Sequence, residues 1–269
     1  MSRKFISVVM AILMAVSMMV SVAVAEEQES DLLAQILERG ELVIATEGTW
    51  SPWTYHDEAD NLVGYDVEVA RLIAEKLGVE ATFVEALWDG IFAGLDAERY
   101  DIVANGVEVT EERAEKYDFS DPYAYARTVV IVKTDNDDIQ SFEDLAGKQT
   151  ANTLASTYAA LAESYGATPV GVDVLDQSFS LVLTGRADAT LNDNVSFYDY
   201  VKVHPDSELK IAATADDAVQ MAIPVRKGPE SASLLAAINE ALAELHADGT
   251  LAALSEKYFG SDISANVTE

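Results

Sequence analysis

Two residues suited to ligand contact occupy matching positions in the two halves of the chain. Arg99-Tyr100-Asp101 precedes one expected strand, and Arg186-Ala187-Asp188 precedes another. Gly106 and Asp193 each lie five residues beyond the aspartate of these triplets, so both fall just past the carboxyl end of a strand. Because open α/β sheets bind ligands at that edge, the spacing places both residues where a ligand is expected.

Other patterns that carry chemistry are incomplete or missing in the sequence. Three histidines stand alone, without the paired spacing of a catalytic zinc site: His56, His204 and His246. The acidic run 135–138 begins like a calcium-binding loop, but its sixth position is not glycine and Ala146 stands where glutamate is required. The run therefore predicts a solvated acidic turn. There is no GxSxG and no phosphate-loop spacing, and nothing in the sequence marks a cofactor or a metal.

Composition and charge exclude several classes of function. The chain has 269 residues, 49% of them hydrophobic and 24% charged, which is typical of a globular protein. Seventeen basic residues against 47 acidic residues give a formal net charge of −30. A phosphate backbone would be repelled, so a nucleic-acid partner is excluded. The absence of cysteine excludes disulfides, thiolate metal ligands, a cysteine nucleophile and a lipid-modified N-terminal cysteine.

The first 25 residues have the pattern of an export signal. Arg3 and Lys4 form a charged start, an apolar stretch covers 5–24, and Ala23-Val24-Ala25 matches the small-x-small cleavage pattern. An uncleaved membrane anchor is the alternative, because the stretch is long enough to span a bilayer. Cleavage leaves 15 basic and 47 acidic residues, a net charge of −32. We therefore expect a periplasmic or otherwise extracytoplasmic protein that is not a lipoprotein.

Alternating strand and helix patterns position the candidate residues. In the first half, strands are expected over 42–45, 81–84 and 101–104, helices over 32–38, 67–77 and 90–97, and an aromatic-rich loop over 48–61. After residue 140, strands are expected over 149–152, 169–172 and 187–191, and helices over 158–165 and 179–183. This alternation predicts βαβ units and mainly parallel sheets.

Two segments rich in β-branched residues, 125–133 and 218–226, connect the halves. They predict that the chain enters a second lobe, leaves it and returns, and that the helical ending 231–259 packs back on the first lobe. The fold class is α/β, with two lobes, two crossover hinge strands and a ligand cleft between the lobes. The predicted boundaries place lobe 1 at 26–129 plus 224–269 and lobe 2 at 130–223.

Two sequence blocks resemble those of a known family. Gly64 to Val69 (GYDVEV), followed by Ile73-Ala74 and Leu77, and Arg113 to Tyr123 (RAEKYDFSDPY) are similar to blocks of the bacterial extracellular solute-binding proteins for polar amino acids. These are receptors of ABC importers with the type II periplasmic-binding-protein fold. The cystine-type branch is the most similar, through Glu47-Gly48-Thr49 and further short matches.

The resemblance implies roles for charged residues. Arg113 matches the arginine that binds the ligand α-carboxylate, and a guanidinium fork suits a planar carboxylate. Thr110 is expected to cap the helix that starts near Glu111. Asp193 matches the acceptor for the α-ammonium group. The alternatives are a surface ion pair for Arg113 and a loop cap for Asp193.

The resemblance also implies backbone and aromatic contacts. Gly106 matches a position whose carbonyl reaches the α-ammonium group, which requires close approach. Ser156 and Thr157 precede a helix whose N-terminus would receive the carboxylate; simple capping is the alternative. Trp50 and Trp88 match the aromatics that sandwich the ligand side chain, whereas Trp53 and Tyr55 are expected to pack in the fold.

The charges predict the kind of ligand. Glu108 stands where relatives commonly carry Thr or Ser, and with Glu47 and Asp193 it would put three carboxylates in a cleft that Arg113 partly offsets. A zwitterionic or cationic amino acid is therefore expected over an acidic one, although no donor is evident for a distal carboxylate such as that of cystine. Glu108 could instead form a surface ion pair with Arg113.

These residues predict a monomeric receptor that captures a polar amino acid and delivers it to the membrane permease of an ABC importer, without enzymatic activity. One alternative is a periplasmic dehydratase-type enzyme on the same scaffold, with Glu108 as general acid. Another is a ligand-sensing component that signals through a membrane partner.

Overall fold

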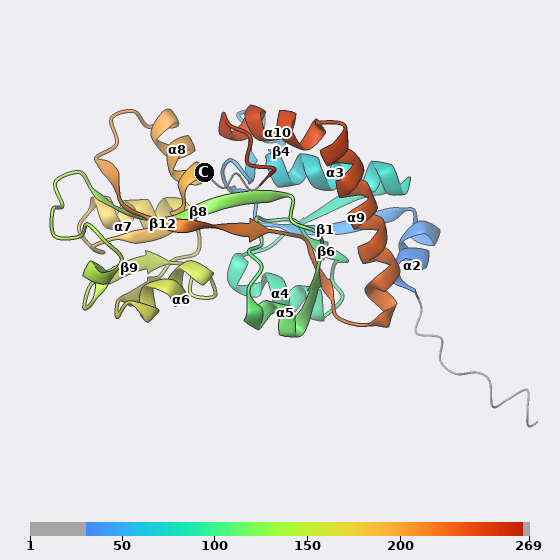
Figure 1. The fold of residues 1–269 in the computed structure, drawn as a ribbon, viewed down its shortest axis with the longest axis horizontal. Helices are drawn as coiled ribbons and strands as arrows, with labels where there is room; N and C mark the ends of the chain where they lie inside the picture. Colours follow the sequence, from blue (N-terminus) through green and yellow to red (C-terminus); the bar gives the residue numbers. More distant parts are fainter. Residues whose placement is uncertain (1–30, 266–269) are drawn as a thin grey trace, which may run out of the picture.

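The computed structural model describes residues 31–265, so the predicted signal segment 1–25 lies outside the described residues. The described chain forms two lobes of strands and helices, joined by long strands that run from one lobe to the other (Figure 1). This two-lobe α/β architecture confirms the fold class predicted from the sequence.

Lobe 1 is built on a parallel sheet with strand order β5-β1-β6. Its first elements are α2 (Leu32–Arg39), β1 (Glu41–Thr46), β2 (Thr49–Trp50), β3 (Thr54–His56), β4 (Leu62–Val63), α3 (Tyr65–Leu77), β5 (Glu80–Glu85), α4 (Trp88–Asp96), β6 (Ile102–Val103), α5 (Glu111–Lys116) and β7 (Tyr117–Phe119). The aromatic-rich loop contains the small antiparallel sheet β2-β3-β4. Its tip is closed by the Asp57 carboxylate, which accepts hydrogen bonds from Ala59 N and Asn61 N, each at 2.9 Å.

Lobe 2 combines an antiparallel sheet, β11-β8-β12, with a parallel pair, β10-β9. Its elements are β8 (Ala124–Lys133), a 3₁₀ turn (Glu143–Leu145), β9 (Gln149–Asn152), α6 (Thr157–Ser164), β10 (Thr168–Gly171), α7 (Leu175–Leu183), β11 (Thr190–Asp193), α8 (Asn194–Val203) and β12 (Leu209–Met221). The proposed lobe boundary at residue 129 falls within β8. The boundary at residue 224 falls at the start of the next strand.

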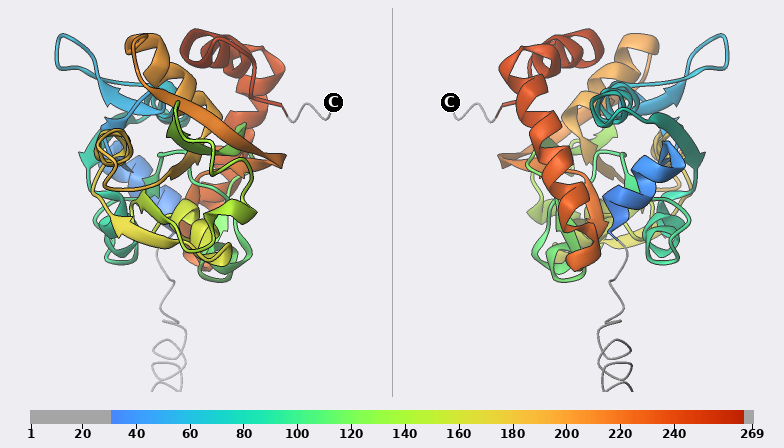
Figure 2. Two further views of the ribbon diagram at one scale, coloured as in Figure 1. Left: turned by 90° about the vertical axis from the view of Figure 1, so that its left-hand side faces the viewer. Right: turned by 90° about the vertical axis from the view of Figure 1, so that its right-hand side faces the viewer.

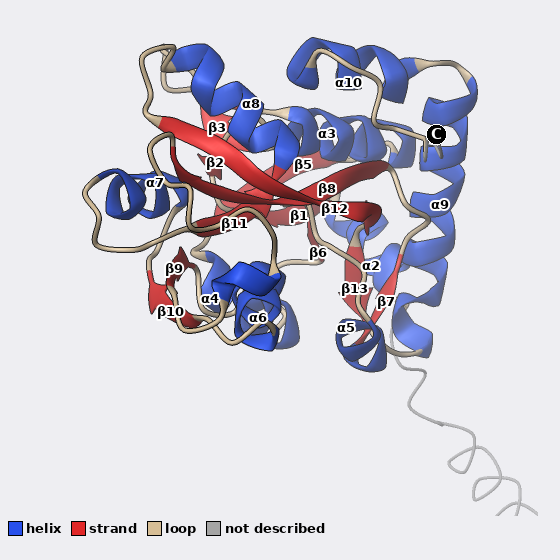
Figure 3. Ribbon diagram, turned by 60° about the vertical axis from the view of Figure 1, so that its left-hand side comes forward, coloured by secondary structure: helices blue, strands red, loops and turns tan. Residues whose placement is uncertain are grey.

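The sheet at the crossovers differs from the expectation of mainly parallel sheets. β8 carries the chain into lobe 2 and β12 carries it back, so the two strands run in opposite directions and pair with each other. β11 also pairs with β8 in the antiparallel sense. Figure 3 shows β8 and β12 side by side along the middle of the molecule. The parallel prediction is therefore wrong for this sheet and correct for β5-β1-β6 and β10-β9.

The C-terminal elements return to lobe 1, as the sequence predicted. They are β13 (Pro224–Arg226), a 3₁₀ turn (Pro229–Ser231), α9 (Ala232–Ala247) and α10 (Thr250–Phe259). α9 lies along the outer side of lobe 1 next to α2 and α3 (Figure 2). The Phe259 ring of α10 packs on Trp53 and Tyr65, with ring centroids 4.8 and 5.0 Å apart. This aromatic cluster joins α10 to the β2-β3-β4 segment.

Candidate ligand-binding site

A cavity lies between the lobes and encloses about 550 Å³, including space that is open to solvent. Eight of the nine predicted site residues line it: Glu47, Trp50, Trp88, Gly106, Glu108, Arg113, Ser156 and Thr157. Five further residues were not predicted from the sequence: Asn152, Thr153, Tyr158, Leu175 and Asn192. Asn152 ends β9, so the rule that ligands bind at the carboxyl ends of strands could have indicated it.

Arg113 is held against two aromatic rings at the wall of the cavity. Thr110 caps α5 and its hydroxyl accepts a hydrogen bond from Arg113 N at 3.2 Å, as predicted. The guanidinium lies 5.2 Å from the ring centroids of both Trp88 and Phe92, and its Nη1 donates to the Glu108 carbonyl at 3.0 Å. These contacts fix the plane of the guanidinium while leaving it at the cavity.

Glu108 lines the cavity and is half-buried. Its backbone forms a bridge with Met221 at the end of β12. Burial raises the pKa of Glu108, while Thr157 of lobe 2 and the nearby Arg113 charge oppose that rise. The Glu108 carboxyl group therefore lies where the two lobes meet and is partly removed from water.

Glu47 is fixed by a reciprocal pair of hydrogen bonds. Glu47 N donates to Asn105 Oδ1, and Asn105 Nδ2 donates to Glu47 Oε2, both at 2.7 Å. Burial raises the pKa of the Glu47 carboxyl group to about 7. A ligand therefore meets a carboxyl group whose charge changes near neutral pH.

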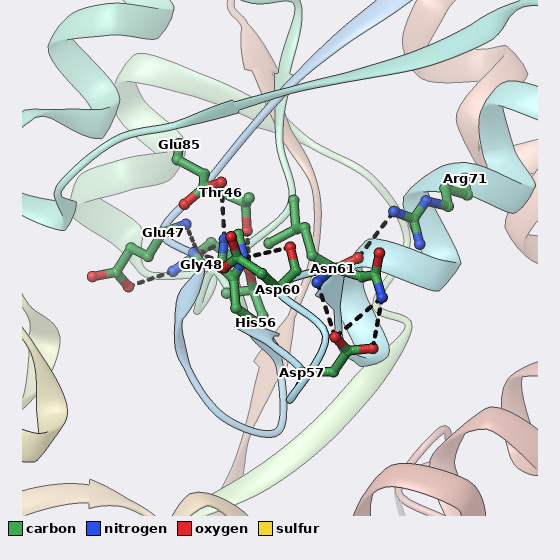
Figure 4. Close-up of polar contacts among 12 residues, drawn as sticks. Thr46, Glu47, Gly48, His56, Asp57, Asp60, Asn61, Arg71 and Glu85 are labelled. Carbon is green, nitrogen blue, oxygen red and sulfur yellow. Dashed lines mark hydrogen bonds and ion pairs between the residues drawn. The ribbon is translucent and has the colours of Figure 1, made fainter.

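Gly48, the residue after Glu47, allows a tight turn between β1 and β2. Gly48 has a φ of 70°, and a Cβ atom there would lie 2.5 Å from the Glu85 carboxylate. His56 Nε2 lies 3.0 Å from the Glu85 carboxylate, so β3 holds that carboxylate over the turn (Figure 4). The sequence did not indicate this support from His56.

Gly106 is packed between the cavity wall and a buried carboxylate. Its φ is 50°, and a Cβ atom would lie 2.8 Å from the Trp50 ring, so a side chain would displace that ring. Gly106 N donates to the buried Asp66 carboxylate at the start of α3, which also accepts from the Tyr123 hydroxyl at 2.7 Å. The GYDVEV block thus supports the Gly106 turn from behind.

Asp193 does not line the cavity. It ends β11 and caps α8, where its carboxylate accepts hydrogen bonds from Ser196 N at 2.6 Å and from Trp53 Nε1 at 3.0 Å. Burial raises the pKa of Asp193 to about 6, and the Tyr158 hydroxyl lies beside the carboxylate. Asp193 is therefore a cap, which was the alternative to ligand contact in the sequence analysis. Contact between Asp193 and a ligand stays a prediction. Trp53 packs in the core, as predicted, and also bonds Asp193.

Helix α6 begins at the cavity with a capped N-terminus. The Ser156 hydroxyl accepts a hydrogen bond from Ala159 N at 3.1 Å, and Thr157 is the first helical residue. The helix starts one residue earlier than expected. Ser156 therefore caps α6, which was the alternative to ligand contact. The remaining N–H groups of the first turn favour an anion nearby.

Several hydrogen bonds cross between the lobes and hold the cleft closed. Trp50 Nε1 donates to Asn192 Oδ1 at 3.2 Å. Away from the cavity-lining residues, the Ser51 hydroxyl donates to Asp199 at 2.7 Å, and Ala155 N donates to Asp89 Oδ1 at 3.0 Å. These contacts require both lobes in their present positions.

Two lobes around a cavity with one guanidinium and two carboxyl groups define a two-lobe binding protein for a small polar ligand. The family model of the bacterial extracellular solute-binding proteins, family 3, matches residues 42–261. The L-cystine-binding protein TcyA of Bacillus subtilis (strain 168) is 42% identical over 238 residues, which cover 88% of each chain. The chain belongs to the bacterial extracellular solute-binding proteins, family 3.

Two solved structures show how relatives are arranged. A P235GK mutant of ArgBP from T. maritima has a TM-score of 0.79 at 34% identity, covering 85% of this chain and 99% of that chain. The L-cystine solute receptor of Neisseria gonorrhoeae, in the unliganded open conformation, has a TM-score of 0.58 at 43% identity, covering 87% and 99%. The more similar sequence has the lower score, as expected when lobes of similar fold are set at a different angle.

The described residues include no helix long and apolar enough to cross a membrane. Residues 31–265 also include no group of three or more histidine or acidic side chains placed to hold a metal ion.

Proposed function

We propose that this protein is the substrate-binding receptor of an ABC importer, which captures a polar amino acid between its lobes and delivers it to the membrane permease. The observation that carries the proposal is the guanidinium of Arg113, held on the rings of Trp88 and Phe92 at the wall of a cavity closed by both lobes. A planar cation at a partly dry wall suits an α-carboxylate.

Around Arg113, we assign the other contacts of the amino-acid head. The N-terminus of α6 at Ser156 and Thr157 would contact the carboxylate from lobe 2. The Gly106 carbonyl and Asp193 would accept from the α-ammonium group, which would replace the Tyr158 hydroxyl beside Asp193. Trp50 and Trp88 would form the walls for the side chain.

The charge of the cavity favours a zwitterionic or cationic ligand. Glu47 and Glu108 line the cavity with Arg113 as the opposing cation, so an acidic side chain would add a further negative charge to a partly dry site. The relatives named above include proteins described as binding L-cystine. We therefore propose a cystine-like or cationic amino acid as the ligand.

A thermal-shift panel of the twenty amino acids plus cystine and ornithine tests this proposal. We expect zwitterionic or cationic ligands to stabilise the protein more than glutamate or aspartate does. Glu108→Thr should reduce this difference in stabilisation. Glu112→Thr, on the exposed side of α5, should leave the difference unchanged. Stabilisation by acidic amino acids alone would contradict the charge argument, and no stabilisation by any amino acid would contradict the receptor proposal.

The enzymatic alternative rests on Glu108, because burial raises its pKa and it lies beside Arg113. A dehydratase-type reaction would use this group as a proton donor. Mass spectrometry of the ligand released from purified protein separates the two functions. An unchanged amino acid supports the receptor, and a dehydrated product supports the enzyme.

The remaining parts of the proposal concern the whole chain. We propose that lobe 1 (26–129 and 224–269) and lobe 2 (130–223) move about the two crossover strands. The signal 1–25 would be cleaved, which leaves a monomer outside the cytoplasmic membrane. The closed cleft and the interlobe hydrogen bonds support the hinge proposal.

A further inference from the structure

Two buried polar atoms of the cavity-lining residues have no hydrogen-bond partner among the described residues. They are Trp88 Nε1, a donor, and Asn152 Oδ1, an acceptor. Trp88 is 8% exposed and Asn152 is 3% exposed. Because a buried unpaired donor or acceptor costs about 1–3 kcal/mol, folded proteins rarely keep one without a reason.

The two atoms come from opposite lobes and are held in place. Trp88 is the first residue of α4 in lobe 1, and its ring packs edge-on against Phe92 with centroids 5.7 Å apart. Asn152 ends β9 in lobe 2, and its Nδ2 donates to the Leu191 carbonyl at 2.8 Å. That bond settles the orientation of the amide, because a flipped amide would set Oδ1 against another carbonyl oxygen.

A ligand that satisfies both atoms needs an acceptor and a donor in its side chain. An aliphatic side chain offers neither, and a guanidinium or ammonium group offers donors alone, which leaves Trp88 Nε1 unpaired. A side-chain amide offers both, but its hydrogen bonds are between neutral groups. The second head group of an amino acid such as cystine offers a carboxylate and an ammonium group. Both hydrogen bonds would then be charge-assisted, and Glu47 and Glu108 would favour the ammonium group.

We infer that Trp88 and Asn152 form a subsite for a distal amino-acid head group, in which Trp88 Nε1 donates to the distal carboxylate and Asn152 Oδ1 accepts from the distal ammonium group. The inference rests on the proposed function, since it assumes that an amino acid occupies the cavity. It supplies the donor for a distal carboxylate that the sequence left unidentified.

Four thioether amino acids with a common stem test the subsite by calorimetry. Cystathionine carries both distal groups, S-(3-carboxypropyl)cysteine the carboxylate, S-(3-aminopropyl)cysteine the ammonium group, and S-propylcysteine neither. We expect cystathionine to bind at least tenfold more tightly than S-propylcysteine. Equal binding of all four would overturn the subsite and leave the receptor proposal intact. If none of the four, cystine or the standard amino acids binds, the receptor proposal itself fails.

Variants assign each atom to its ligand group. Trp88→Phe should weaken binding of the two ligands with a distal carboxylate at least fivefold relative to S-propylcysteine, which serves as the reference for lost ring contacts. Asn152→Leu should weaken binding of the two ligands with a distal ammonium group by the same factor. Thr150→Val is the control, because the Thr150 hydroxyl is also buried and unpartnered in β9 but does not line the cavity. It should leave all four affinities within twofold.

The outcomes remain decisive if one variant is unstable. Asn152→Leu also removes the bond to Leu191, so its fold is checked by circular dichroism. If it does not fold, the affinity ratio of S-(3-aminopropyl)cysteine to S-propylcysteine on the unmodified protein replaces it. A ratio near one would overturn the role of Asn152, and unchanged ligand ratios in Trp88→Phe would overturn that of Trp88.

Discussion

At the residue scale, Arg113 is the cation on which the amino-acid site depends. Its guanidinium is fixed by Trp88, Phe92 and the Glu108 carbonyl. Arg113→Ala should weaken amino-acid binding by roughly 2–5 kcal/mol, because the ligand carboxylate would be buried without a partner. The affinity of Arg113→Lys should fall between those of the unmodified protein and Arg113→Ala, since an ammonium group keeps the charge but loses the planar fork. Calorimetry of the three proteins measures the order.

A second arginine provides the control for this substitution. Arg71 also lies over a ring, 5.3 Å from the Phe83 centroid, and donates to the Leu62 carbonyl at 3.0 Å, but it does not line the cavity. Arg71→Ala should leave the affinity within twofold. An affinity of Arg113→Ala within threefold of the unmodified protein would remove Arg113 from the site.

Glu47 should give the protein an unusual dependence of stability on pH. Its pKa is about 7 in the folded protein against an ordinary value of 4.5, because burial disfavours the charged form. Above pH 4.5 the unfolded chain releases this proton while the folded chain keeps it. This contribution to the free energy of unfolding therefore falls as pH rises from about 4.5 to about 7, by up to about 1.4 kcal/mol per pH unit.

Urea unfolding at pH 4.5, 5.5, 6.5 and 7.5 measures this effect. Glu47→Gln should lose less stability than the unmodified protein across that window, since glutamine does not titrate. Glu112→Gln, whose carboxylate is 82% exposed, should keep the original profile. Asp66 and Asp193 contribute with the same sign in both proteins, because their pKa values are also raised by burial, to about 7 and about 6. Parallel profiles for Glu47→Gln and the unmodified protein would contradict this assignment.

At the scale of elements, the N-termini of α4 and α6 meet across the cleft. Asp89 in the first turn of α4 accepts a hydrogen bond from Ala155 N, just before α6. Neither residue lines the cavity described above. Asp89→Ala should therefore weaken binding about fivefold by removing one hydrogen bond of the closed state, without removing a ligand contact. Calorimetry measures the change.

Asp176→Ala is the matched control for this substitution. It removes an acid from the first turn of α7, a helix that lies within lobe 2. Asp176→Ala should leave ligand affinity unchanged. An Asp89→Ala affinity equal to that of Asp176→Ala would show that the interlobe bond does not contribute to closure.

The elements differ in how far the sequence could predict them. Helix α3 ends at Gly78 as expected, because glycine adopts the left-handed conformation found there, with a φ of 74°. Helix α8 was not predicted, since its cap Asp193 was matched to a ligand role. The antiparallel β11-β8-β12 sheet was missed because strand direction depends on which lobe each strand enters, and no local pattern records that.

The site shows the same division between local and distant information. Gly106 could be found because it lies just past the end of one strand, whereas Glu108 and Arg113 were found through the resemblance of this segment to the family. The bond from Trp53 Nε1 to Asp193 joins residues 140 positions apart, and no pattern near either residue indicates it. The same holds for Trp88 and Asn152, whose unpartnered atoms come from different lobes.

At the scale of the whole molecule, closure should accompany ligand binding. The interlobe bonds Trp50–Asn192 and Ser51–Asp199 require the closed arrangement, and a relative at 43% identity has been solved in an unliganded open conformation. Small-angle scattering should therefore give a smaller radius of gyration with ligand than without it. An unchanged profile at saturation would contradict movement of the lobes.

The net charge predicts how salt acts on the folded molecule. With 47 acidic and 17 basic residues, the chain carries a net charge of −30, and most carboxylates have no cation available to pair with. Exposed carboxylates repel one another over about 10 Å at 0.1 M salt and over longer distances at lower salt. This repulsion destabilises the compact state more than the expanded unfolded chain.

Raising sodium chloride from 20 to 500 mM should therefore increase the melting temperature of the ligand-free protein by about 3 °C or more, which corresponds to roughly 1 kcal/mol for a domain of this size. Screening also weakens ion pairs, such as Lys76–Glu244 at 2.6 Å, but exposed pairs contribute little, so the loss of repulsion dominates. Differential scanning calorimetry at pH 7.5 measures the shift, and sucrose at equal osmolality is the control for effects other than screening. A melting temperature that falls with sodium chloride would show that ion pairs outweigh the repulsion between carboxylates.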